Sequence, residues 1–128
     1  MGQMTKGKTE VWGGGHHDHL PVFSKKAVNW YKRWHNLRHV DVQIMIYEEG
    51  SESDGQWGSC NEIEGRYEIE VYGSQPLRDF IATIMHEMIH VKQWETGTWD
   101  NDGEEEAEFY QYILADKFWK SGGMIHDE

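Results

Sequence analysis

A long helical pattern over residues 77–95 is the feature that most constrains this chain. Pro76 is tolerated just before it, because an amide hydrogen in the first turn of a helix has no helical partner. Gly97 just after it is a natural helix stop. Most large apolar side chains fall on one side of this helix and polar ones on the other. The pattern therefore predicts a helix with a buried back and a polar front that forms the floor of a cleft.

The polar front carries the sequence His86-Glu87-Met88-Ile89-His90, an H-E-x-x-H motif. Residues four apart on an α-helix differ by only about 40° around its axis, so both imidazoles can bind one tetrahedral metal ion. Glu87 projects farther round the same side, where it can reach a water molecule held by the metal and serve as a catalytic base. A purely structural zinc site has no use for that base, so the motif predicts a catalytic zinc centre.

A catalytic zinc site needs a third protein ligand and an open position for water. We expect this ligand on a last helix over residues 104–119, where helical periodicity places Glu106 inside the apolar arc. A carboxylate that faces the core is costly unless it is paired or binds a metal, so Glu106 is the predicted ligand. Glu105 at the edge of the arc and His126 in the tail are the alternatives. Two further acids are expected on a solvated face that favours the helix N-terminus: Glu104 and Glu108.

The rest of the chain predicts an α+β domain. A helix is expected near residues 24–38, with Ser24 as its N-cap. Alternating apolar residues predict strands over residues 40–47 and 66–72, with a shorter third strand near 56–60. The expected sheet therefore has three strands.

The first twenty residues have no hydrophobic period and contain three consecutive glycines followed by the tract His16-His17-Asp18-His19. We expect residues 1–20 to form a flexible arm and residues 21–128 to form one domain. The histidine tract has two further interpretations, an accessory metal site or a segment that covers the active site.

Two stretches of the sequence resemble known peptidases. The motif at His86–His90, followed by a loop and a helix with Glu106-Ala107, resembles zincin metallopeptidases of the gluzincin type, in particular minigluzincins and ImmA/IrrE-like peptidases. In those families a glutamate on the next helix is the third ligand, and Glu106 matches it. Trp57-Gly58-Ser59-Cys60 resembles a stretch that precedes the motif in SprT-like zincins. Those enzymes usually take a third histidine downstream, whereas the next histidine in this chain is His126.

The resemblance implies a minimal zincin fold: an N-terminal helix, a small twisted sheet, the motif helix and a C-terminal helix that carries the third ligand. It implies a zinc metallopeptidase that hydrolyses a peptide or protein substrate with Glu87 as general base. Tyr110 and Tyr112 are candidate donors to the developing oxyanion, or core residues. The alternatives are a zinc-binding domain without turnover and a protein-interaction domain. Cys60 is expected to be a packed residue and not a nucleophile.

Charge narrows the classes of partner. Twelve Lys and Arg residues stand against 23 Asp and Glu residues, a formal net charge of −11. Phosphate backbones and anionic membranes attract basic surfaces, so neither nucleic acid nor a membrane is expected as a partner. One cysteine permits no intramolecular disulfide, and we find no signal-peptide pattern or membrane-spanning run. We therefore expect a cytoplasmic protein.

Overall fold

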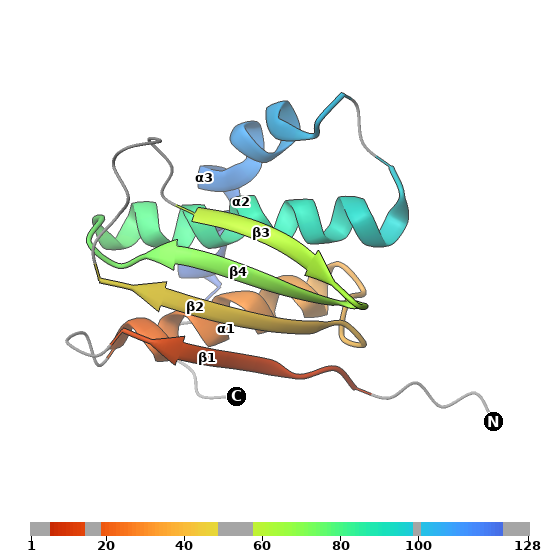
Figure 1. Cartoon of the computed structure of the whole chain (residues 1–128). Coiled ribbons are helices and arrows are strands. Elements are labelled where there is room, and N and C mark those ends of the chain that lie inside the picture. The colour runs from red at the N-terminus through yellow and green to blue at the C-terminus, as the bar shows by residue number, and fades with distance from the viewer. Residues whose placement is uncertain (1–5, 15–18, 49–57, 99–100, 122–128) are drawn as a thin grey trace.

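The computed structural model describes residues 6–14, 19–48, 58–98 and 101–121. Within these ranges the chain is an α+β protein with three helices and a four-stranded mixed sheet (Figure 1). In chain order the elements are β1 (Thr9–Gly13), α1 (His19–Trp34), β2 (Asp41–Tyr47), β3 (Gly58–Ile63), β4 (Arg66–Tyr72), α2 (Leu77–Thr96) and α3 (Glu104–Lys120).

The sheet has the strand order β1-β2-β4-β3. β1, β2 and β4 run parallel, and β3 runs antiparallel to β4. Alternate residues of β2 and β4 are buried, as the sequence predicts, and Ile44 of β2 lies opposite Ile69 of β4. In the described part of the chain β3 pairs with one strand, so its outer backbone edge is available.

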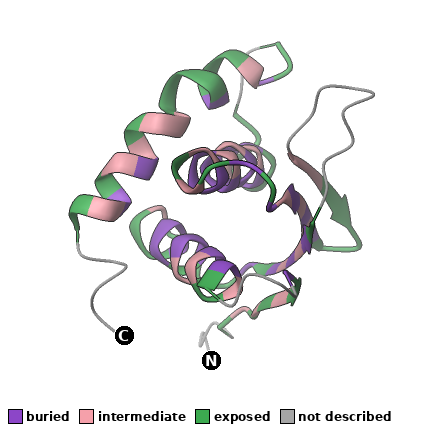
Figure 2. Cartoon of the chain, turned by 90° about the vertical axis from the view of Figure 1, so that its left-hand side faces the viewer, coloured by how far each residue is buried: buried purple, intermediate pink, exposed green. Residues whose placement is uncertain are grey.

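The helices lie together on one side of the sheet (Figure 2). α1 and α2 both contact strands of the sheet, and α3 packs on α2. The back of α2 supplies a large share of the core, with these residues almost fully buried: Phe80, Ile81, Ile84, Met85, Met88 and Val91. Because α2 touches α1, the sheet and α3, its orientation is fixed from several sides.

The predicted end of α2 is confirmed. Gly97 adopts a left-handed backbone with φ of 69°, and its amide donates to the carbonyl of Gln93 at 2.7 Å. A residue with a Cβ is strained in that conformation, which is why glycine ends the helix here. None of the helices in the described ranges is both long enough and apolar enough to cross a membrane.

The amino-terminal region differs from the expected flexible arm. Thr9–Gly13 form β1, which adds a fourth strand to the sheet beside β2. Lys32 of α1 holds this strand, because its Nζ donates to the Lys8 carbonyl at 3.2 Å and to the Thr9 hydroxyl at 2.9 Å. A five-residue strand with only partial burial carries too little alternation to be recognised, and its pairing partner is distant in sequence. The ordered domain therefore begins before residue 21.

α1 also begins earlier than the sequence predicts. Its first residue is His19, and Ser24 lies buried inside the helix, where its hydroxyl donates to the Pro21 carbonyl at 2.9 Å. A serine that bonds a preceding carbonyl is compatible with a helix interior, so Ser24 is not the N-cap. Residues 16–18 of the histidine tract lie outside the described ranges.

Candidate metal centre

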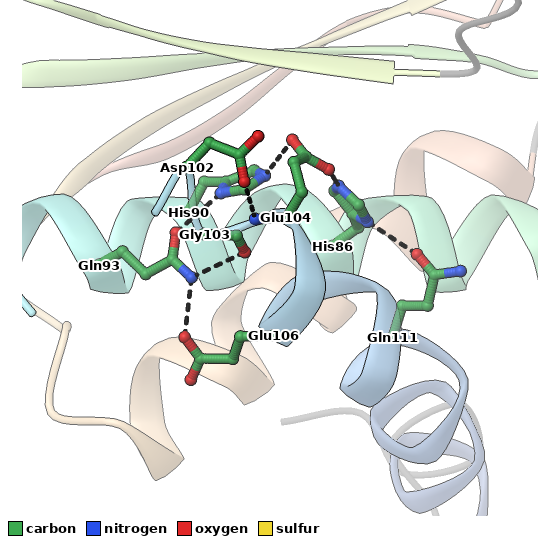
Figure 3. A network of polar contacts seen from close by, with 8 residues as sticks. All are labelled: His86, His90, Gln93, Asp102, Gly103, Glu104, Glu106 and Gln111. Carbon is green, nitrogen blue, oxygen red and sulfur yellow. Dashed lines mark hydrogen bonds and ion pairs between the residues drawn. The ribbon is translucent and has the colours of Figure 1, made fainter. Parts of the chain in front are cut away.

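The two motif histidines of α2 face the first residue of α3. His86 Nε2 lies 3.0 Å from one carboxylate oxygen of Glu104, and His90 Nε2 lies 3.1 Å from the other (Figure 3). One candidate ligand atom from each residue lies within 4.8 Å of the other two. Tetrahedral zinc with bonds of about 2.0–2.1 Å separates neighbouring ligand atoms by about 3.3 Å. The three side chains are therefore spaced to hold one ion after small adjustments.

The opposite ring nitrogens show why these three groups fit a cation. His86 Nδ1 lies 2.7 Å from Gln111 Oε1, and His90 Nδ1 lies 2.8 Å from Gln93 Oε1 (Figure 3). An amide oxygen only accepts, so each Nδ1 carries the hydrogen and donates. A neutral imidazole then points the bare lone pair of Nε2 at a carboxylate, which is also an acceptor. Two acceptors at this distance need a cation between them, either a proton or a metal ion.

Glu87 lies beside this cluster, between α2 and β3. Its side chain is buried, with 6% exposure. Burial, together with the nearby Glu104 carboxylate, raises the pKa of Glu87 to about 8. A cation at the cluster would oppose that rise, because positive charge favours the carboxylate. A carboxyl with a pKa near neutrality is suited to exchange a proton at physiological pH.

Gly58 allows β3 to pass close to Glu87. A Cβ at Gly58 would lie 2.5 Å from the Thr83 methyl group and 3.4 Å from Glu87 Oε2. The first of these contacts is impossible without a shift, so a side chain at Gly58 would push the strand away from α2. Because Gly58 has no side chain, β3 can lie close to Glu87, the proposed base.

A cleft of about 820 Å³ lies between β3, α2 and α3, and it is lined by Gly58, Glu87 and the three residues of the candidate metal centre. A cleft of this size is typical of ligand-binding sites. Tyr112 is at its wall, with its hydroxyl donating to Asp79, whereas Tyr110 is exposed elsewhere on α3. Cys60 also lines the cleft, and burial raises the pKa of its thiol far above its ordinary value, so the thiol stays protonated.

The structure brings His86 and His90 together and places Glu104, and not Glu106, beside them. Glu87 lines the same cleft. Glu106 is exposed, and its carboxylate accepts a hydrogen bond from the Gln93 amide at 2.8 Å. Glu105 is exposed, and His126 lies outside the described ranges.

The reason for this difference is the rotation of α3 about its own axis. The predicted apolar arc relied on Tyr110 and Ile113, which are 43% and 41% exposed. The buried residues of α3 are instead Ala107, Ala115 and Phe118. At about 100° per residue, Glu104 falls near the centre of the arc that these three define, and Glu106 falls far from it.

The sequence motif alone did not predict Gln93 and Gln111 as hydrogen-bond partners of the two histidines. Gln93 follows His90 by three residues, so it lies on the same face of α2. Gln111 follows Glu104 by seven residues, two helical turns, and so shares its face on α3. The position of Gln93 follows from the predicted polar face of α2, whereas that of Gln111 could be used only with the rotation of α3 known.

Comparison of the chain with protein-family models, with curated proteins and with solved structures gives no match. The geometry of the site is therefore the basis on which a function can be proposed.

Proposed function

We propose that this protein is a zinc-dependent metallopeptidase with a zincin-like site, in which His86, His90 and Glu104 hold the metal and Glu87 is the general base. One observation carries the proposal: both Nε2 atoms converge on the Glu104 carboxylate while both Nδ1 atoms donate to amide oxygens. The gluzincin resemblance requires a glutamate from the helix after the motif. Glu104 is the residue of that helix whose position supports this role.

Two imidazoles and a carboxylate are a donor set that suits zinc, and three protein ligands leave a fourth position for water. When bound, zinc would lower the pKa of that water and polarise the carbonyl of a substrate. Glu87 is on the cleft side of α2, where it would take a proton from the attacking water and return it to the leaving amine. Its burial supports this role, because a desolvated carboxylate is a stronger base than an exposed one.

The edge of β3 supports a peptide as substrate. Gly58, Ser59 and Cys60 of this strand line the cleft, and the strand pairs with β4 through one edge. An extended peptide can add to such an edge through backbone hydrogen bonds, which recognise any sequence. In this arrangement the substrate backbone would run between β3 and the three metal-binding residues.

The test combines metal content with peptide cleavage. The purified protein, loaded with zinc, is expected to bind about one equivalent and to cleave members of a diverse peptide mixture, with products identified by mass spectrometry. Glu87→Gln is the matched control, because it keeps the size of the side chain and the metal ligands but removes the base. Zinc binding without cleavage in either protein would favour a non-catalytic metal domain. Failure of the wild type to bind added zinc would contradict the proposal of a metallopeptidase and favour a protein-interaction domain.

A further inference from the structure

A second polar cluster lies behind the candidate metal centre, where α2 meets the start of α3. Its centre is the side-chain amide of Gln93, which is 5% exposed. Gln93 Oε1 lies 2.8 Å from His90 Nδ1, and Gln93 Nε2 donates to the Gly103 carbonyl at 3.1 Å and to Glu106 at 2.8 Å (Figure 3). Every polar atom of this amide therefore has a partner.

The two partners of Gln93 Nε2 determine which way the amide points. A backbone carbonyl and a carboxylate both only accept hydrogen bonds. If the amide were reversed, its oxygen would face these two acceptors, and both hydrogen bonds would become repulsive contacts. The Gln93 oxygen must therefore point at His90, which in turn requires the hydrogen of His90 on Nδ1 and leaves Nε2 free to bind a metal.

Gly103 makes room for this arrangement. A Cβ at Gly103 would lie 2.3 Å from Gln93 Oε1 and 2.7 Å from Gln93 Cδ, far inside contact distance. Gly103 also has a φ of 79°, a conformation that side chains with a Cβ rarely adopt. Gly103 therefore allows the backbone conformation from which α3 begins and leaves space for the side-chain amide of Gln93.

We infer that Glu106 is a positioning residue that orients the Gln93 amide and so fixes the His90 tautomer that a metal ligand needs. The hydrogen bond to the Glu106 carboxylate involves a charged acceptor, so it is the stronger of the two that hold Gln93 Nε2. The importance of this tautomer for zinc rests on the function proposed above. The tautomer itself is a property of the metal-free protein and can be measured without zinc.

The direct test is ¹⁵N NMR of the imidazole of His90, at a pH where histidine is neutral. A Glu104→Ala background removes the acceptor that competes for a hydrogen on Nε2, and a His90→Gln variant assigns the signal. We expect the Nδ1–H tautomer in this background and a shift toward Nε2–H when Glu106→Ala is added. Gln93→Leu gives the full effect for comparison, and Glu105→Ala is the matched control because Glu105 is an exposed neighbour on the same turn. Glu106→Gln keeps an acceptor and should restore the Nδ1–H form.

A tautomer that does not change in Glu106→Ala, although it changes in Gln93→Leu, would overturn the inference. Zinc affinity gives a second readout in the otherwise wild-type chain. Loss of a group that orients a metal-bound histidine weakens metal binding by about ten-fold to a hundred-fold. We expect a Kd for zinc raised about ten-fold in Glu106→Ala and unchanged in Glu105→Ala. If the wild type binds no zinc, the proposed function fails, whereas the NMR result still decides the role of Glu106.

Discussion

α2 and α3 meet at the candidate metal centre, but their sequences determine its geometry in different ways. α2 buries a continuous row of large apolar residues, so its rotation is set by the core and its polar face can be predicted. α3 buries Ala107, Ala115 and Phe118 and exposes several large apolar residues, including Phe109. When two of the three buried residues of a helix are alanines and several large apolar residues are exposed, the positions of its large residues do not reveal its rotation. Which residue of α3 is the proposed metal ligand depends on that rotation.

Matched phenylalanines give the largest test of this contrast. Phe80 on α2 is fully buried, whereas Phe109 on α3 is 66% exposed. We expect Phe80→Ala to lower the free energy of unfolding by about 3–5 kcal/mol, because it removes a buried ring and leaves a cavity. Phe109→Ala should change it by less than about 0.5 kcal/mol. Urea unfolding followed by circular dichroism measures both, and equal losses would contradict the burial described for α3.

Two acids on the same helices give the next test. Glu87 has a pKa raised to about 8 from an ordinary value of 4.5, mainly through burial, so the folded protein keeps its proton at pH values where the unfolded chain has lost it. The metal-free protein should therefore lose stability as the pH rises through this window. Glu87→Gln should make the free energy of unfolding depend less on pH. The same substitution at exposed Glu105, Glu105→Gln, should leave that dependence unchanged. Unfolding curves of the metal-free wild type and both variants between pH 5 and pH 8 measure this dependence. The same change of stability with pH in all three proteins would refute the prediction.

The glycine at the end of α2 and the glycine just before α3 allow a further test of this comparison, with a smaller expected change in stability. Gly97 and Gly103 both have positive φ, at 69° and 79°, but a Cβ at Gly97 meets nothing within 4 Å. Gly97→Ala should cost about 1–2 kcal/mol for the backbone alone. Gly103→Ala should cost more and should also weaken zinc binding, because the new Cβ displaces the amide of Gln93. Thermal unfolding with and without zinc measures both effects; equal behaviour of the two variants would show that the contact with Gln93 is unimportant.

The sequence was sufficient to predict a feature when all of its residues lie in one helix or one strand. His86, Glu87 and His90 lie within five residues of one helix, and their spacing alone places them together. β2 and β4 alternate clearly enough to predict their bounds to within a residue. The features that were missed are relations between distant segments. Examples are the pairing of β1 with β2 and the contact of Gln93 with Glu106, neither of which has a local signal.

The most direct test of the account is zinc binding by the wild type, Glu104→Ala and Glu106→Ala, measured by elemental analysis and by competition with a chelator. We predict about one zinc per chain in the wild type, loss of that zinc in Glu104→Ala, and its retention with about ten-fold weaker affinity in Glu106→Ala. Circular dichroism of each variant would establish that the fold is kept. Loss of zinc in Glu106→Ala with full retention in Glu104→Ala would contradict the central claim that Glu104 is the third ligand.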